Sequence, residues 1–358
     1  MTYALADLVN FAEQLLGASG LDEDKSKAVA RLLVRADAMG HNTHGLAQLA
    51  DYLDEIETGG MAKSGAARVI SDRGAAIVWD GERLPGVWLT SKALEVGVAR
   101  AREHGLCAIS IRRSHHIGCL ASFLPDATEA GMMAIIASSD PSDAMVAPYG
   151  GTRAVFTPDP IAIGIPTSAE PILIDISASI TTAGMSARLR RAGKCFPGPW
   201  ALTAAGHPTD DPNVLNHEPK GTLLPIGGID HGHKGYGLAL MVEALTQGLS
   251  GYGRAEQETG WGASVFVQVF DPQAFAGLDS FARQTQAIAT ACQHNPPIRA
   301  DRPVRLPGAT ALAGLRHAEV AGIDLYPGIL DGLRGFAAKY GVGLPLSAAP
   351  PQEAQSII

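Results

Sequence analysis

The spacing of the apolar residues changes several times along the chain, and these changes limit the folds that the chain can adopt. Over about the first 60 residues, apolar side chains recur at helical spacing. From residue 67 onward, Gly and Pro turns and two helical stretches separate short β-rich runs, at residues 68–70, 76–79, 108–111, 134–137 and 172–176. Helical spacing returns at residues 234–249 and, after a strand-like run at 264–270, dominates residues 275–292, 309–319 and 327–340.

These segments predict an α/β (α+β) protein with a central sheet domain and a discontinuous helical domain. Flanking helical segments commonly close on each other, so both ends of the chain are expected to build the helical domain. The expected boundaries are residues 1–66 for its N-terminal part, 67–256 for the sheet domain and 257–358 for its C-terminal part.

Three successive helices are predicted in the N-terminal part. Asp22 is expected to cap the second helix and Thr43 the third. The third helix should end at Gly59-Gly60, and its inner face carries Leu46, Leu49, Leu53 and Ile56. The helix predicted at residues 234–249 should bury Leu238, Met241, Val242 and Leu245.

Charge and composition exclude several classes of function. The net charge is −8 and no Lys/Arg-rich cluster is visible, which argues against nucleic-acid binding. No apolar run reaches the ~18–20 residues that cross a membrane, and the first residues are predicted to be a helix and not a signal peptide. The four cysteines lie far apart without a CxxC pair, which favours the reducing cytoplasm.

General cofactor motifs are missing from the chain. It contains no GxGxxG dinucleotide fingerprint, no GxxxxGK[ST] phosphate loop and no HExxH zinc pair. His, Gly and Pro are instead concentrated at residues 41–45, 114–118, 148–166 and 225–237. These segments therefore contain the candidate functional residues.

His116 lies between a predicted strand and a predicted helix, where side chains commonly reach a binding cleft. An imidazole there can act as a general acid and take the proton back in the reverse direction. The alternative is a histidine that only stabilises the turn. His44 stands beside Thr43 at the predicted helix start, where the helix dipole disfavours its charged form. It is either a hydrogen-bond donor to a substrate oxygen or a second helix cap.

Two further positions suit an anionic cofactor. Asp175 ends an apolar run, where ligands often meet a sheet, although it can also cap the next element. Lys234 follows Gly227, Gly228 and Gly232 at a helix start, so backbone N–H groups and an ammonium converge where a phosphate can bind.

Taken together, these segments resemble the malate/L-lactate dehydrogenase family, whose members do not use a Rossmann fold. The order and spacing match across nearly the whole chain. The matching motifs are Thr43-His44-Gly45, His115-His116-Ile117-Gly118, Ala147-Pro148-Tyr149-Gly150-Gly151, Asp159-Pro160-Ile161-Ala162, Pro225-Ile226-Gly227-Gly228 and Lys234-Gly235-Tyr236-Gly237-Leu238-Ala239.

The resemblance implies a homodimer with its active site near the subunit interface and NAD or NADP held on a mainly antiparallel sheet. It implies that His116 supplies the proton and His44 assists while hydride passes to a small 2-oxo acid or cyclic 2-imino acid. Substrate contacts are expected from Thr43, Gln48 and Gly118. Cofactor contacts are expected from Ser139, Asp175, Ile176, Ser177, His233, Lys234, Gly235, Pro307, Gly308 and Ala309.

Four positions depart from the family pattern. Gln48 replaces an Arg, Asp159 an Asn, Met185 a Lys and Ala309 a Glu. Gln48 is neutral, which leaves two possibilities. Either the part of the substrate that lies beside Gln48 is less acidic, or another cation binds the substrate carboxylate, such as Arg112, Arg113 or a partner-subunit residue. The sequence contains no fingerprint that chooses between NAD and NADP.

Two other functions fit the same residues. A metal-dependent hydrolase or lyase would use histidine ligands, drawn from His41, His44, His116, His231 and His233. A family member that binds a ligand without catalysis would explain the four departures.

Overall fold

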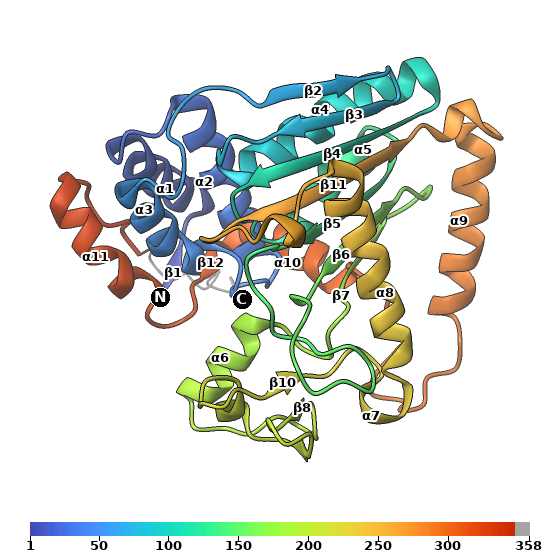
Figure 1. The fold of residues 1–358 in the computed structure, drawn as a ribbon. Coiled ribbons are helices and arrows are strands. Elements are labelled where there is room, and N and C mark those ends of the chain that lie inside the picture. The colour runs from blue at the N-terminus through green and yellow to red at the C-terminus, as the bar shows by residue number, and fades with distance from the viewer. Residues whose placement is uncertain (348–358) are drawn as a thin grey trace, which may run out of the picture.

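A seven-stranded sheet forms the centre of the computed structural model, which describes residues 1–347 (Figure 1). The strand order is β2-β3-β4-β11-β5-β6-β7, and β3 and β4 form the one parallel pair in this sheet. The strands are β2 (Arg68–Asp72), β3 (Ala76–Asp80), β4 (Leu106–Ser114), β5 (Met133–Ser139), β6 (Pro160–Ile165), β7 (Ile172–Ser177) and β11 (Ala263–Phe270). The mainly antiparallel sheet predicted for the fold class is therefore confirmed.

Strand β11 lies in the middle of the sheet although it comes from the last third of the chain. Val267 pairs with Ile109 of β4 on one side and with Ile136 of β5 on the other. Residues 263–267 are all buried, as expected for a strand covered on both faces. The sheet segment therefore extends to Phe270, beyond the boundary expected at residue 256.

Helices cover both faces of the sheet. Helix α4 (Gly86–His104) packs on β4 and β11. On the opposite face lie α8 (His233–Glu243) and the π-helical turn Ala244–Gly248, where the Ser110 hydroxyl donates to the carbonyls of Leu245 and Thr246. Because side chains alternate along a strand, the neighbours of Ser110 in β4 point toward α4, which explains why Ile109 and Ile111 belong to the main core.

Both ends of the chain build one helical layer. Helices α1 (Leu5–Ala18), α2 (Glu23–Ala38) and α3 (Leu49–Thr58) pack with α11 (Ile329–Tyr340) on the left of Figure 1, and α10 (Ala309–Ala321) packs on α2 nearer its centre. The short strand β1 (Thr2–Tyr3) pairs with β12 (Ile323–Asp324). The prediction that both ends contribute to the helical part is therefore confirmed.

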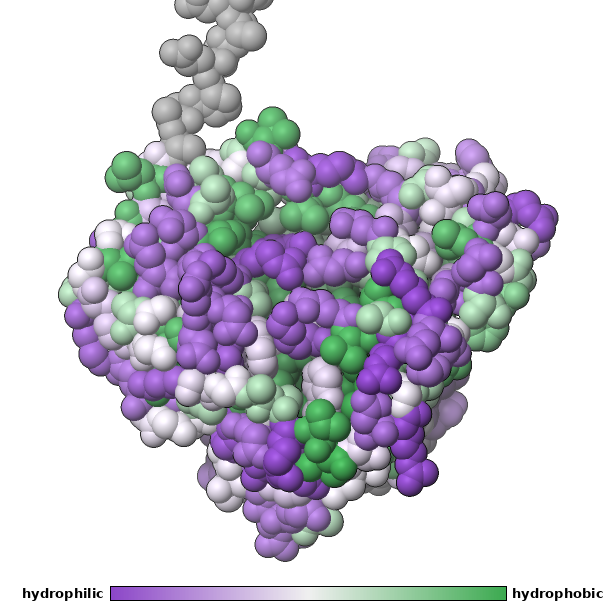
Figure 2. All heavy atoms as spheres, turned by 90° about the horizontal axis from the view of Figure 1, so that it is seen from above, coloured by the Kyte–Doolittle hydropathy of each residue, from purple (hydrophilic) through white to green (hydrophobic). Residues whose placement is uncertain are grey.

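The remaining elements lie around the sheet. A small three-stranded sheet lies beside α6, below the main sheet in Figure 1. Helix α9 runs along the right side of the molecule in the same view. The elements are η2 (Leu120–Phe123), α5 (Leu124–Glu129), α6 (Ala183–Arg191), β8 (Ala201–Leu202), β9 (Pro208–Thr209), η3 (Pro212–Leu215), β10 (Thr222–Leu223), α7 (Gly228–His231), η5 (Arg254–Glu256), η6 (Pro272–Ala274) and α9 (Leu278–Gln293). Seen from above, hydrophobic residues lie in strips between hydrophilic ridges (Figure 2). No helix of the described part could span a membrane.

The third helix starts later than predicted, and Thr43 does not cap it. Helix α3 begins at Leu49, after the 3₁₀ turn η1 (Leu46–Gln48). The buried carboxylate of Asp37 takes the capping role, because its Oδ2 accepts a hydrogen bond of 2.7 Å from the Leu46 N–H. Gly45 lets the backbone pass Asp37, since a Cβ atom there would collide with the carboxylate. The predicted end is correct, with Gly59 in the left-handed conformation.

The predicted inner face of α8 is wrong at Met241. Val242 is buried as predicted, but the Met241 side chain is 44% exposed. Met241 and Val242 are adjacent on the helix and point about 100° apart, and the buried face runs through Gly235, Ala239 and Val242. Thr246 and Gln247 are the buried residues of the π-helical turn that follows.

Asp159, where the family pattern has Asn, is fully buried at the start of β6. The Thr157 hydroxyl donates to its Oδ1 at 2.6 Å, and its Oδ2 has no partner. Burial and the nearby charge of Glu243 raise the pKa of Asp159 to about 8. Asp159 is therefore neutral at pH 7, and its left-handed φ of 45° is one that Asn also tolerates. This departure is chemically small.

We expect Asp159→Asn to stabilise the protein, by at least about 1 kcal/mol at pH 8. Between its ordinary pKa of 3.8 and its folded pKa of about 8, this carboxyl ionises only in the unfolded chain, so wild-type stability falls as the pH rises through this range. Urea unfolding at pH 4.5, 6 and 8 should show a gain that grows with pH. The control is the exposed Asp230→Asn, and a gain independent of pH would contradict the assignment.

Candidate active site

His44 and His116 face each other between the helical layer and the turn that follows β4. Their ring centroids are 6.0 Å apart and the rings are 30° from parallel. The Thr43 hydroxyl lies 2.8 Å from His44 Nδ1, and the Tyr52 hydroxyl lies 2.8 Å from His116 Nδ1. Both Nδ1 atoms are thus engaged, which leaves the two Nε2 atoms as the positions for binding a small molecule.

Tyr52 on α3 fixes the orientation of the His116 ring. Its hydroxyl also lies 3.4 Å from the His116 carbonyl oxygen, and the Gly118 nitrogen lies 3.4 Å from His116 Nδ1. Burial raises the pKa of Tyr52, so the phenol stays neutral. A hydroxyl can donate to Nδ1 or accept from it, and Tyr52 is therefore compatible with either tautomer of His116.

Both imidazoles are neutral at pH 7. Burial lowers the pKa of His44 to about 4, and burial together with the neighbouring His44 and His115 holds the pKa of His116 well below its usual range. Burial, and not the helix dipole inferred from sequence, is the cause at His44. A neutral imidazole can take a proton from a bound hydroxyl group and return it in the reverse direction.

Trp261 covers His116 and His115 from the loop before β11. Its ring stacks on His116 with centroids 4.7 Å apart and an interplanar angle of 29°, and it meets the His115 ring edge-on at 5.0 Å. His115 in turn lies 3.2 Å from the Glu55 carboxylate of α3. Sequence reasoning missed Tyr52, Trp261 and Glu55. The helical spacing could have revealed Tyr52, because it lies three residues after Leu49 on the predicted inner face of the helix. No sequence pattern pointed to Trp261.

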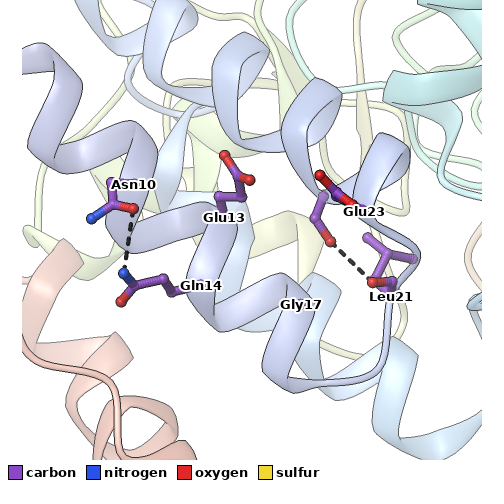
Figure 3. Close-up of a pocket in the computed structure, with 7 residues that line it drawn as sticks. Asn10, Glu13, Gln14, Gly17, Leu21 and Glu23 are labelled. Carbon is purple, nitrogen blue, oxygen red and sulfur yellow. Dashed lines mark hydrogen bonds between the residues drawn. The ribbon is translucent and has the colours of Figure 1, made fainter.

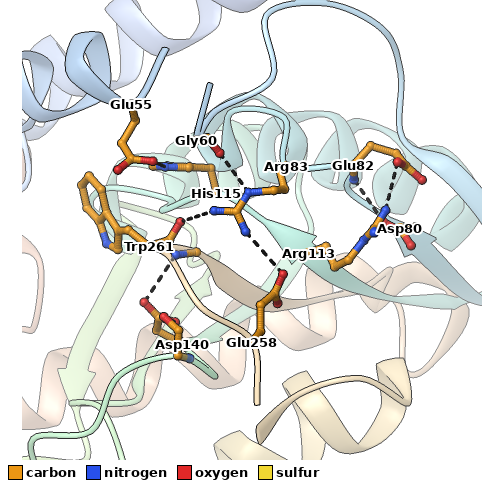
Figure 4. Close-up of polar contacts among 12 residues, drawn as sticks. Glu55, Gly60, Asp80, Glu82, Arg83, Arg113, His115, Asp140, Glu258 and Trp261 are labelled. Atoms are coloured by element: carbon orange, nitrogen blue, oxygen red, sulfur yellow. Dashed lines mark hydrogen bonds and ion pairs between the residues drawn. The ribbon is translucent and has the colours of Figure 1, made fainter. Parts of the chain in front are cut away.

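Arg83 holds the Trp261 loop against α3 (Figure 4). Its guanidinium donates to the carbonyls of Gly60 at 2.9 Å and Trp261 at 3.2 Å, and it pairs with Glu258 at 3.3 Å. On the other side of the loop, the Gly262 N–H donates to Asp140 at 3.4 Å. Arg83 thus joins three segments: the end of α3, its own segment after β3, and the loop that covers His116.

A buried carboxylate, Asp80, binds the two arginines that precede the histidine turn. It accepts hydrogen bonds from Arg112 at 3.1 Å and Arg113 at 2.8 Å, and its side chain is 1% exposed. Burial alone raises the pKa of Asp80, but the hydrogen bond from Arg113 and the surrounding charges hold it below its usual range. Arg113 also pairs with Glu82. Arg112 and Arg113, considered from sequence as partners of a substrate carboxylate, are therefore engaged elsewhere.

Gln48 also has an internal partner. Its side-chain amide donates to the Thr43 carbonyl at 2.8 Å. It thereby holds the turn that carries Thr43 and His44. The Gln48 side chain is half-buried and lies near the other substrate residues predicted from sequence. Gly118 also lies there, since a Cβ atom added to it would contact the His44 carbonyl oxygen.

Three of the four predicted cofactor segments meet along the edge strand β7. At its start, the Leu173 N–H donates to the Pro307 carbonyl at 3.1 Å, and a Cβ atom at Gly308 would lie 2.6 Å from the Leu173 Cβ. Beyond its end, Ala178 accepts a hydrogen bond from Ile226, whose carbonyl accepts one from Gly235. The structure thus brings together the predicted residues Asp175, Ile176, Ser177, His233, Lys234, Gly235, Pro307, Gly308 and Ala309.

Ser139, the fourth segment, is placed differently. It is buried at the end of β5, its hydroxyl lies 2.7 Å from that of Thr246, and it accepts a hydrogen bond from Gln247 at 3.0 Å. Because the Thr246 hydroxyl donates to the Val242 carbonyl, the Ser139 hydroxyl must donate to Thr246. Its side chain is fully engaged inside the protein, so contact with a ligand would have to come from its backbone.

The five histidines proposed as ligands of a hydrolytic metal do not converge. His231 and His233 form a separate pair at α7 and α8, with ring centroids 6.2 Å apart. Within residues 1–347, no cluster of metal-ligating side chains contains either of them, His44 or His116. The histidine-based metal site is therefore wrong.

Two hollows lie away from the histidine pair. The one drawn in Figure 3, of about 230 Å³, is lined by polar residues of α1 and the start of α2, including Asn10, Glu13 and Gln14. The other, of about 170 Å³, is lined by Pro171, Leu306 and Ala309 among others, and so borders one predicted cofactor segment.

This chain is similar to several known proteins that are named as dehydrogenases. The family model described as malate/L-lactate dehydrogenase matches residues 3–334. Malate dehydrogenase of Pyrococcus horikoshii is 30% identical over 94% of this chain and 94% of its own. (2R)-3-sulfolactate dehydrogenase (NADP(+)) of Chromohalobacter salexigens is 30% identical over 94% of this chain and 98% of its own. The crystal structure of malate dehydrogenase from Entamoeba histolytica, 24% identical, has the same fold with a TM-score of 0.90, covering 97% of this chain and 99% of that chain.

We expect Asp80→Asn to lower the free energy of unfolding by about 1.5–3 kcal/mol at pH 7, because the variant loses charged hydrogen bonds in a buried position. The pKa of Asp80 is lowered in the fold, so this stabilisation is present above its ordinary pKa of 3.8 and is lost as the pH falls through its folded pKa. Urea unfolding measures the effect. The control is Glu95→Gln, which removes an exposed ion pair with Lys92, and an equal loss in both variants would contradict the role given to Asp80.

Proposed function

The chain belongs to the malate/L-lactate dehydrogenase family and is an oxidoreductase, and we propose that it transfers a hydride between NAD or NADP and a small 2-oxo or 2-hydroxy acid, or a cyclic 2-imino acid. The observation that carries this proposal is the half-buried His116, whose Nδ1 is held by Tyr52. An imidazole fixed in this way can move a proton at Nε2 without reorienting.

In the oxidative direction, the substrate hydroxyl donates a hydrogen bond to Nε2 of neutral His116. The ring takes this proton at Nε2 as the hydride leaves the carbon, while its Nδ1–H donates a hydrogen bond to the Tyr52 hydroxyl oxygen. His44, neutral and held by Thr43, offers its Nε2 to a substrate oxygen. The bound nicotinamide supplies or accepts the hydride. In reduction, protonated His116 returns the proton to the new alkoxide oxygen or to the amine nitrogen.

The segments along β7 fit a nicotinamide dinucleotide. Gly235 and Gly308 lie where a Cβ atom would collide with neighbouring protein atoms, so these glycines let the three cofactor segments pack closely against one another. His233 and Lys234 are exposed at the start of the 11-residue helix α8, where an anionic diphosphate is favoured. One relative is named for NADP(+), and nothing in these segments selects it over NAD for this chain.

A carboxylate partner for the substrate is available on α6. Gln48, Arg112 and Arg113 are engaged elsewhere. The half-buried Arg188 instead donates to Asn42 at 2.9 Å and stacks on the Tyr326 ring at 3.8 Å, next to the loop that carries His44. It lies one helical turn after Met185, the position of the family's Lys, and we assign it to the substrate carboxylate.

The proposal includes a homodimer in the cytoplasm. Four large apolar side chains are exposed on and near α7 and α8, namely Ile229, Leu240, Met241 and Leu249, with exposed fractions of 43%, 47%, 44% and 56%. Burying them against a second copy would be favourable. All four cysteines are free thiols, which fits a reducing compartment.

A screen of 2-oxo acids and cyclic imino acids, followed by the absorbance of reduced nicotinamide with both cofactors, tests the activity. On the best substrate we expect His116→Ala to lower kcat by ~100- to 10,000-fold while the Kd for the reduced cofactor, measured by fluorescence, changes little. A variant that keeps more than about a tenth of the wild-type kcat would contradict the role of His116.

Arg188→Gln is expected to raise the KM for the acid substrate by about 10- to 100-fold, because a charged hydrogen bond to the carboxylate is lost. The matched control on the same helix is the exposed Arg191→Gln. Equal kinetics of the two variants would show that the substrate carboxylate binds elsewhere.

A further inference from the structure

His41, Cys119 and Asp175 converge from three distant segments of the chain. His41 lies in the loop after α2, Cys119 in the turn after β4, and Asp175 in β7. One ligand atom of each lies within 4.8 Å of the other two, and this is the one group of this kind among the described residues. None of the three has a role in the proton transfer described above.

The surrounding backbone holds these residues in place. The Ala121 N–H donates to Asp175 Oδ2 at 2.9 Å, and Cys119 Sγ lies 3.9 Å from the same oxygen. The His41 N–H donates to the Ala36 carbonyl at 2.8 Å, and its carbonyl accepts from the His44 N–H at 2.9 Å. The His41 ring itself makes no hydrogen bond within residues 1–347. The set is therefore positioned before any ion binds.

We propose that His41, Cys119 and Asp175 bind one divalent cation of the Zn²⁺ type. An imidazole nitrogen, a thiolate and a carboxylate oxygen are ligands that Zn²⁺ takes in tetrahedral sites, and a water molecule would complete the coordination. Ca²⁺ and Mg²⁺ prefer oxygen ligands only, and a set that contains a thiol and an imidazole selects against them. On binding, the Cys119 thiol gives up its proton to solvent as its sulfur joins the metal.

The position of the site gives the ion a consequence. His41 and Cys119 each lie three residues from His44 and His116, respectively, so the ion ties the two histidine-bearing segments together. It also engages Asp175, which the proposed function assigns to the cofactor. Resting on that proposed function, we infer that Zn²⁺ inhibits the enzyme in competition with the nicotinamide cofactor.

Cobalt(II) spectroscopy tests the metal site without any turnover. Cys195 and Cys292 are exposed, so both are first changed to Ser to remove adventitious thiols. Titrating this background protein with Co²⁺ should give a near-ultraviolet thiolate-to-cobalt charge-transfer band that saturates at one equivalent and disappears on adding Zn²⁺. Cys119→Ser should abolish the band, and His41→Asn should weaken Co²⁺ binding at least about tenfold.

The control is Cys107→Ser, which removes the other buried thiol and should leave the band unchanged. Circular dichroism confirms that each variant folds. Absence of the band, its survival in Cys119→Ser, or cobalt binding without thiolate features, as at His231 and His233, would overturn the site. If a higher cofactor concentration does not relieve inhibition by Zn²⁺, the inference that Zn²⁺ competes with the cofactor is wrong. If the protein turns over none of the acids but gives the cobalt band, the proposed function is refuted and the metal site is still supported.

Discussion

Three residues beside the histidine turn have left-handed backbone angles, and the buried carboxylate of Asp80 holds the segments in which they lie. These residues are Glu82, Arg83 and Arg113, with φ of 50°, 56° and 48°. Each such conformation costs on the order of 1 kcal/mol for a residue with a Cβ atom. Asp80 offsets this cost because one of its oxygens accepts from both the Glu82 N–H and Arg113. The turn from Ser114 to Gly118 therefore starts from a rigid base.

The histidine pair depends on two parts of the fold that meet at this base. The helical layer supplies His44 and Tyr52, while the sheet supplies the turn with His116. Neither part covers the rings alone, and their contact leaves both histidines only partly exposed. Burial is what keeps both imidazoles neutral, so packing between the two parts sets the protonation state as well as the distance.

Periodicity predicted the helices, most of the sheet and the contribution of both chain ends, because these depend on local spacing. The cap at Thr43 failed because Asp37, from the preceding helix, binds the Leu46 N–H. The inner face of α8 failed at Met241 because apolar spacing does not decide which of two adjacent apolar residues, Met241 or Val242, faces the core. Motif matching pointed to His44 and His116, and the structure places them together. Trp261 reaches the site through contacts with His116 and Arg83, which lie 145 and 178 residues earlier in the sequence, and no local pattern encodes such contacts.

The central place of β11 governs how this chain can fold during synthesis. Strands β4 and β5 are made early but pair with β11 and not with each other, and β11 spans residues 263–270. Until that segment leaves the ribosome, both strands expose an unpaired edge of main-chain N–H and carbonyl groups. The nascent chain is therefore open to misassociation from the completion of β4 at Ser114 until β11 is complete at Phe270, a period in which chaperones would bind it.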